Sequence, residues 1–229
     1  MDAPRYDFSQ DWFTDRIPQF ERFLQHLKGT PCRLLEVGSH EGRATTWLVE
    51  NIATHPSAVI DTIDLHEHPT FRANIAATGS AQKVHLHLGS SARMLRALPF
   101  DAFDFAYIDG CHWTVETLED AVLAFPLVRA GGIIAFDDYL WDDASPEQQC
   151  RPKEAIDAFL AVYGDKIELL HRRYQVWVRT KLPSQITYRK RPSLRRNRPS
   201  PYSIQSKWLR HPRKQFAAVW RRIYDDGQI

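Results

Sequence analysis

The sequence predicts an α/β fold in which a mostly parallel, doubly wound sheet carries helices on both faces. From residue 17 to residue 180, apolar segments of strand length alternate with segments of helical periodicity. One segment, Ile133-Ile134-Ala135-Phe136, is apolar throughout, as a strand covered on both faces should be. Polar residues stand at the ends of the first five expected strands, where open α/β sheets bind their ligands: Glu36, Asp64, Ser90, Asp109 and Asp137.

The first half of the expected fold follows from apolar spacing and turn residues. Phe20, Phe23, Leu24 and Leu27 lie on one helical face, which predicts an amphipathic helix over Pro18–Leu27. Ser91 is a suitable N-cap for the helix that follows the third strand. We expect strands over residues 32–37, 59–65 and 84–88, and helices over residues 41–51, 71–77 and 92–98.

The second half continues the alternation and ends in an antiparallel pair. Gly131-Gly132 should end the helix before the fifth strand, since glycine is a poor helix former. Two short segments after the last helix resemble a hairpin on the sheet edge. We expect strands over residues 103–108 and 133–136, helices over 115–128 and 152–163, and hairpin strands over 167–170 and 174–178.

The first strand leads into a glycine turn that is suited to a ligand. Gly38 lets the backbone turn sharply, and Gly42 precedes the next helix, whose free N–H groups point back into the turn. The turn lacks the Gly-Lys-Ser/Thr ending of a P-loop and the third glycine of a dinucleotide fingerprint. Glu36 favours a ligand that carries an amine or hydroxyls and little negative charge.

Composition indicates an ordinary globular protein with a basic tail. Of 229 residues, 43% are hydrophobic and 25% are charged. We expect no signal peptide and no membrane span. We also expect no disulfide framework, because the three cysteines are odd in number and widely spaced, and this suggests a cytoplasmic protein. Residues 181–229 hold 13 Lys or Arg and two Asp, a net charge of +11, whereas residues 1–180 carry −9.

Several strings resemble the class I S-adenosylmethionine-dependent methyltransferases. Leu35-Glu36-Val37-Gly38-Ser39-His40-Glu41-Gly42 is similar to their first motif, although His40 stands where many members have a second glycine. The strings Tyr107-Ile108-Asp109-Gly110-Cys111-His112 and Phe136-Asp137-Asp138-Tyr139 resemble the small metal-dependent sugar and macrolide O-methyltransferases, with Cys111 in place of a common acid. The resemblance covers about residues 17–180. It implies a Rossmann-like sheet of seven strands and S-adenosylmethionine as the methyl donor.

The resemblance and the strand-end pattern together assign the site. Glu36 should meet the amino-acid end of the donor, Asp64 its ribose hydroxyls and the Gly89-Ser90 loop its adenine side. The expected donor-binding residues are Glu36, Gly38, Ser39, His40, Gly42, Asp64, Leu65, Ser90, Asp109 and Trp113. Tyr139, Trp141, Asp142 and Asp143 follow the fifth strand and are candidates to line the acceptor site.

The acids after the fourth and fifth strands predict a cation and a base. Asp109, Asp137 and Asp138 should converge and bind Mg²⁺ or Mn²⁺, which would lower the pKa of an acceptor hydroxyl. The alternative is that Asp137 and Asp138 only cap a turn. His112 is the expected general base, with Asp109 as the alternative, and a purely orienting role for His112 weighs equally. His66, His68, His85 and His87 are more simply explained by exposure than by metal binding.

The sequence therefore predicts an O-methyltransferase for a small hydroxylated acceptor such as a sugar or glycan. Its parts would be a lead-in (residues 1–16), a methyltransferase domain (17–180) and a basic tail (181–229). A basic amphipathic helix over Arg213–Tyr224 could lie on an anionic membrane, bind RNA or pack on the acidic body. The alternatives are an RNA methyltransferase guided by the tail and a non-catalytic nucleoside-binding protein.

Overall fold

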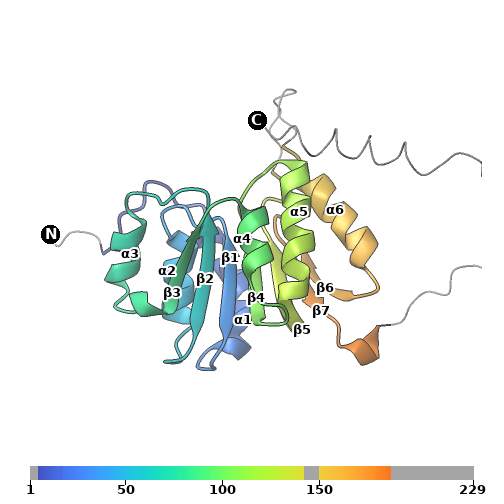
Figure 1. Cartoon of the computed structure of the whole chain (residues 1–229), viewed down its shortest axis with the longest axis horizontal. Helices are drawn as coiled ribbons and strands as arrows, with labels where there is room; N and C mark the ends of the chain where they lie inside the picture. The colour runs from blue at the N-terminus through green and yellow to red at the C-terminus, as the bar shows by residue number, and fades with distance from the viewer. Residues whose placement is uncertain (1–4, 142–149, 187–229) are drawn as a thin grey trace, which may run out of the picture. The chain divides into compact units, whose positions relative to one another are not determined.

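The fold confirms the predicted α/β class and its seven-stranded sheet (Figure 1). The computed structural model describes residues 5–141 and 150–186. The strands are β1 (Arg33–Val37), β2 (Val59–Asp64), β3 (Val84–Leu88), β4 (Phe103–Ile108), β5 (Val128–Phe136), β6 (Ile167–Arg172) and β7 (Val176–Thr180). The α-helices are α1 (Ile17–Leu24), α2 (Arg43–Asn51), α3 (Phe71–Ala77), α4 (Ser91–Ala97), α5 (Thr114–Ala124) and α6 (Pro152–Tyr163).

The strand order determines which loops meet at the carboxyl edge of the sheet. The order is β3-β2-β1-β4-β5-β7-β6, with β1 to β5 parallel and β7 antiparallel to both of its neighbours. The order reverses between β1 and β4, and such a switch point is where doubly wound sheets bind ligands. The predicted hairpin is β6–β7, and β7 rather than β6 pairs with β5.

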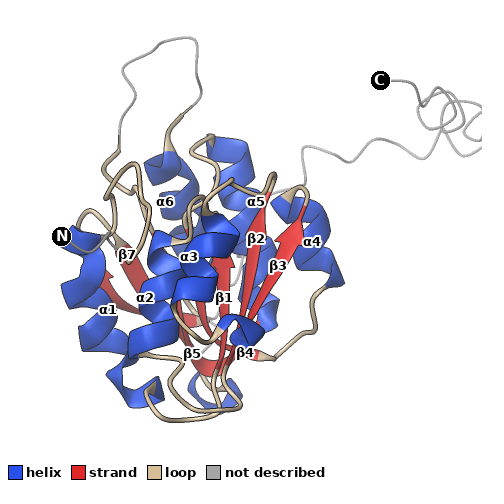
Figure 2. Cartoon of the chain, turned by 90° about the vertical axis from the view of Figure 1, so that its left-hand side faces the viewer, coloured by secondary structure: helices blue, strands red, loops and turns tan. Residues whose placement is uncertain are grey.

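Two apolar cores cover the two faces of the sheet. One contains α1 and α2 packed on the sheet, with Phe20, Leu24 and Trp47 among its buried residues. The other contains α4, α5 and α6, with Leu95 and Phe159 among its buried residues. Figures 1 and 2 show α1, α2 and α3 on one side of the strands and α4, α5 and α6 on the other. The continuous apolar stretch in β5 is explained by this double cover.

The structure moves three predicted boundaries. The helix expected to reach Val128 ends at Ala124 because Pro126 cannot continue it; a short 3₁₀ turn follows, and β5 begins at Val128 and runs through both glycines. The first crossover helix begins at Arg43 instead of Glu41, since His40 and Gly42 have positive φ. Ser90, not Ser91, is the N-cap of α4, and its side chain makes no capping hydrogen bond.

Other features agree with the sequence or lie beyond the described residues. No disulfide joins any of the three cysteines, all of which lie within the described residues, and no helix in that part of the chain is long and apolar enough to cross a membrane. Residues 5–16 of the lead-in are irregular apart from a 3₁₀ turn at Thr14–Arg16. The helix expected over Arg213–Tyr224, like most of the basic tail, lies outside the described residues, as do Asp142 and Asp143. The three-part division of the chain stays a prediction.

Candidate active site

The glycine turn after β1 is tightly packed against the end of β4. Gly38 has φ of +88°, and a Cβ on it would lie 2.0 Å from the carbonyl oxygen of Asp109. Gly42 has φ of +82°, and a Cβ there would come within 3.1 Å of the Phe71 ring. Both positions therefore require glycine, because a side chain would be strained and would displace its neighbours. The two glycines therefore allow the turn to pack directly on the end of β4 and on α3.

The carboxylate of Asp64 shapes this turn from the end of β2. Its Oδ2 accepts hydrogen bonds from the backbone N–H groups of Ser39, at 3.0 Å, and His40, at 2.8 Å. These bonds stabilise His40 in its left-handed conformation, with φ of +45°. The second oxygen, Oδ1, has only a long 3.4 Å contact with the N–H of His66. Asp64 therefore keeps one oxygen at the carboxyl edge that can accept hydroxyl groups.

Glu36 is a buried acid with an unsatisfied oxygen. Its side chain is 1% exposed, and Thr45 donates a hydrogen bond to Oε2. Oε1 is buried and makes no well-formed hydrogen bond among the described residues, although the hydroxyl of Thr62, which is also unpaired, lies near enough to lower the pKa of this carboxyl group. Burial raises the pKa of Glu36 to about 7. An orphaned carboxylate oxygen beside a glycine turn fits a ligand that brings an ammonium or hydroxyl group.

The other expected donor-binding residues lie open on the same edge. Leu65 and Trp113 are among the exposed large apolar side chains, and Ser90 is exposed at the start of α4. His40 stacks near His68, with ring centroids 4.6 Å apart, and near Trp12, at 5.7 Å. Trp12 is a lead-in residue that the sequence did not single out, because a lone tryptophan in an irregular segment carries no motif.

A second cluster forms where β4, β5 and the β6–β7 turn end. Asp109, His112, Asp137 and Asp138 line one small recess. His112 Nε2 lies 2.8 Å from Asp138 Oδ2, and Trp141 lies beside the imidazole with ring centroids 4.5 Å apart. The hydrogen bond to Asp138 raises the pKa of His112, although burial opposes this. Burial, and then repulsion from Asp137 and Asp138, raises the pKa of Asp109 well above its usual range.

Four residues that the sequence analysis missed complete this cluster. Tyr107 donates a hydrogen bond to Asp137 Oδ2, and Gln175 Nε2 lies 3.2 Å from the same oxygen. Tyr174 donates to Asp138 Oδ1 at 2.9 Å. Arg16 places Nε 3.5 Å from Asp137 Oδ1. Only Tyr107 lay inside a recognised string; the others come from the lead-in and from a hairpin turn, where no pattern marks them.

These contacts decide how well the cluster fits a divalent cation. Every carboxylate oxygen of Asp137 and Asp138 already has a protein partner. For Asp137, Oδ1 faces the N–H of Asp138 and Arg16, and Oδ2 faces Tyr107 and Gln175. For Asp138, Oδ1 faces Tyr174 and Oδ2 faces His112. Within residues 5–141 and 150–186, no three His, Cys, Asp or Glu side chains are arranged to hold a metal ion. The described residues therefore do not fit the predicted Mg²⁺ or Mn²⁺, and the mechanism below uses no step through it.

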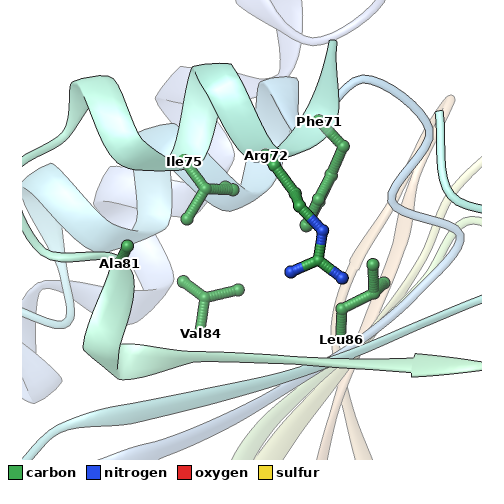
Figure 3. A pocket seen from close by; sticks show the side chains of 6 residues that line it. All are labelled: Phe71, Arg72, Ile75, Ala81, Val84 and Leu86. Carbon is green, nitrogen blue, oxygen red and sulfur yellow. The ribbon is translucent and has the colours of Figure 1, made fainter. Parts of the chain in front are cut away.

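Two other expectations change in the structure. Tyr139 does not line the recess: it is 4% exposed, and its hydroxyl contacts Asp157 and Arg172. His87 is held by the buried carboxylate of Asp61, at 2.8 Å, rather than being simply solvated, and His85 lies 3.6 Å from the same carboxylate. A separate cavity of about 190 Å³ lies between α3 and β3 (Figure 3). None of the predicted site residues lines it: its walls are Phe71, Arg72, Ile75, Ala81, Val84 and Leu86.

Comparison with known proteins identifies the class. Residues 35–139 match the family model described as a methyltransferase domain. This match spans the glycine turn, the end of β2 and the acids after β4 and β5. Together with the strand order, it shows that residues 35–139 are similar to a methyltransferase domain. No curated protein matches the chain.

Solved structures share the fold at low sequence identity. The O-methyltransferase TomG from Streptomyces achromogenes, in complex with S-adenosylmethionine, is 18% identical, with a TM-score of 0.58 over 72% of this chain and 80% of that one. An O-methyltransferase from Bacillus cereus, in complex with S-adenosylhomocysteine (SAH), is 20% identical, with a TM-score of 0.55 over 78% and 84%. MycE from the mycinamycin pathway, solved with Mg, SAH and mycinamycin VI, is 18% identical, with a TM-score of 0.54 over 78% of this chain and 52% of its own.

Burial of Glu36 should make the stability of the protein fall as pH rises. Because the folded chain keeps this proton up to a pKa of about 7 whereas the unfolded chain releases it near 4.5, the contribution is lost between pH 4.5 and 7. Glu36→Gln should remove roughly 3 kcal/mol of this pH dependence. Urea unfolding at several pH values measures it, with the exposed Glu21→Gln as a matched control. Identical pH profiles for Glu36→Gln and the wild type would contradict the assignment.

Proposed function

We propose that the protein is an O-methyltransferase that transfers the methyl group of S-adenosylmethionine to a small hydroxylated acceptor such as a sugar or glycan. The single observation that carries the proposal is the His112–Asp138 pair at 2.8 Å, on the same sheet edge as the glycine turn. Deprotonating an alcohol needs a positioned base, and a histidine held by a carboxylate supplies one. The O-methyltransferases of the same fold, two of them solved with the donor or its product, support the choice of reaction.

The donor would be held by the turn after β1 and its neighbours. When bound, it supplies an electrophilic methyl group on a sulfonium. Oε1 of Glu36 would accept a hydrogen bond from the ammonium of the donor, and the free oxygen of Asp64 would accept those of the ribose hydroxyls. The backbone of Gly38 to Gly42 would lie along the donor, with Leu65, Ser90 and Trp113 around the nucleoside.

His112 would take the proton from the acceptor hydroxyl. Its Nε2 is bonded to Asp138 Oδ2, which leaves Nδ1 as the atom that accepts a proton. Asp138 is fixed in turn by Tyr174 at 2.9 Å, so the imidazole is oriented before the acceptor arrives. Burial and repulsion from Asp137 and Asp138 raise the pKa of Asp109, which favours its neutral form, so we assign the role of base to His112.

The divalent cation is left out of this proposal. MycE was solved with Mg, but the carboxylate oxygens that would bind a cation here are engaged by protein donors. Binding of RNA or of an anionic membrane by residues 181–229 stays a prediction from their charge of +11. Salt-sensitive RNA binding that is lost on deleting the tail would favour an RNA methyltransferase. Donor binding without turnover on any hydroxylated acceptor would favour a non-catalytic protein.

Asp64→Ala should weaken SAH binding by about tenfold or more. A hydrogen bond to a charged group contributes roughly 1.5–3 kcal/mol of binding free energy. The substitution also removes the hydrogen bonds that Asp64 accepts from the backbone N–H groups of Ser39 and His40. Calorimetry with SAH measures the affinity, and Asp15→Ala, an exposed acid of the lead-in, is the control. Wild-type affinity in Asp64→Ala would remove Asp64 from the donor site.

His112→Gln should reduce kcat by roughly 10²- to 10⁴-fold, the usual contribution of a general base, while SAH affinity stays unchanged. Transfer of labelled methyl from S-adenosylmethionine to a panel of sugars and glycans measures turnover. Asp138→Asn should lower kcat in the same direction, since it loosens the imidazole, whereas the exposed His26→Gln should behave like the wild type. Unchanged turnover in His112→Gln would leave His112 an orienting residue.

A further inference from the structure

Arg16 is an unusual cation because it is largely buried beside Asp137, one of the acids that line the recess. Its side chain is 21% exposed, and Nε is buried without a hydrogen-bond partner among the described residues. Its guanidinium carbon lies 3.9 Å from the centre of the Tyr174 ring, which supports the charge by a cation–π contact. A buried arginine without a hydrogen bond at Nε is costly, so its placement calls for an explanation.

The surroundings of Arg16 are strongly anionic. Asp137 Oδ1 lies 3.5 Å from the Nε atom of Arg16. Asp138 accepts a hydrogen bond from the hydroxyl of Tyr174, the residue whose ring faces the guanidinium. Asp109 lies close enough to repel both carboxylates. Crowded carboxylates require either protonation or a nearby cation, and the charge of Arg16 supplies one.

The lead-in and α1 fix Arg16 in this position. The N–H of Arg16 donates to the carbonyl of Phe13 at 2.8 Å, and Arg43 holds the same turn through Thr14 at 2.7 Å. Four residues later, Phe20 is fully buried and packs against Tyr107 with ring centroids 5.0 Å apart. Tyr107 is the residue that donates to Asp137. Arg16 and Tyr107 therefore reach Asp137 from two elements that pack on each other.

We propose that Arg16 is the built-in cation of the acceptor site and occupies, beside Asp137, the place that a divalent metal ion would otherwise take. This inference rests on the proposed function for the identity of the site. A guanidinium 3.5 Å from Asp137 Oδ1 repels an incoming divalent ion and offsets part of the negative charge of the carboxylate. It also holds Asp137 next to Asp138, so Arg16 is a positioning residue that acts through these carboxylates. The site would then be electrostatically complete without a metal ion.

The test is the binding of Mn²⁺ alone to the full chain, followed by electron paramagnetic resonance. Arg16→Gln should bind Mn²⁺ at least tenfold more tightly than the wild type, because a positive charge is removed while the carboxylates remain. Arg16→Lys keeps the charge and should stay within threefold of the wild type. Arg22→Gln, an exposed arginine in α1, the helix that begins directly after Arg16, is the matched control and should not differ from the wild type.

The gained affinity should map to Asp137. Arg16→Gln combined with Asp137→Asn should lose the increase, which separates this site from other acids of the chain. Arg16→Met, with the same expectation, replaces Arg16→Gln if the latter shows no cooperative melting transition. The inference would be overturned if Arg16→Gln and Arg16→Met both bound Mn²⁺ within threefold of the wild type. It would also be overturned if the increase in Mn²⁺ affinity persisted after Asp137→Asn.

Calorimetry with SAH separates this inference from the proposed function. All Arg16 variants should bind SAH like the wild type, because Arg16 contacts the acceptor side rather than the glycine turn. If the wild type does not bind SAH, the proposed function fails, while the Mn²⁺ comparison still decides whether Arg16 excludes a divalent ion.

Discussion

The site depends on how closely the ends of β1 and β4 approach each other at Gly38. The N–H of Asp109 donates to the carbonyl of Val37 at 2.8 Å, and a Cβ on Gly38 would overlap the Asp109 carbonyl. This contact fixes the turn that begins the proposed donor site against the strand end that begins the proposed acceptor site. Since methyl transfer requires the two reactants to be held in line, their relative position is set by the backbone and not by mobile side chains.

The second constraint is that several acidic side chains are buried close together at the carboxyl edge of the sheet. Glu36, Asp109 and Asp137 all have raised pKa values, chiefly because burial penalises their ionised forms. Asp137 and Asp138 are stabilised by Tyr107, Gln175, Tyr174, His112 and Arg16. The network joins the lead-in, two parallel strands and the final hairpin. It explains why the lead-in, which carries no motif, contributes to the site.

The sequence predicted the sheet well because each strand is apolar and bounded by turn residues. Phe71–Ala77, Val84–Leu88 and Phe103–Ile108 were predicted to the residue. The predicted end of α5 is wrong, because the helix stops at Ala124, before Pro126, and not at Gly131-Gly132. Glycine suits both positions in β5, because Gly132 packs too closely on Val128 and Asp104 for a side chain and Gly131 has a positive φ of +85°.

The site was predictable only in part, since residues are brought together by tertiary packing. Glu36, Asp64 and Asp109 follow strands, so their common edge can be inferred from the parallel order. Whether three acids converge on a metal ion depends on which donors face them, and Arg16, Tyr174 and Gln175 come from distant segments. The pairing of His112 with Asp138 also arises from the fold, because no spacing in the sequence specifies it.

The most direct test of this account is SAH binding to Gly38→Ala. Gly79→Ala is a matched control, because Gly79 also has positive φ, +70°, but a Cβ there would meet nothing within 4 Å. Both variants pay the backbone penalty of roughly 1–2 kcal/mol in stability, whereas only Gly38→Ala forces β1 and β4 apart. The account predicts at least a tenfold loss of SAH affinity in Gly38→Ala and none in Gly79→Ala. Wild-type affinity in Gly38→Ala, with a loss of stability equal to that of Gly79→Ala, would contradict it.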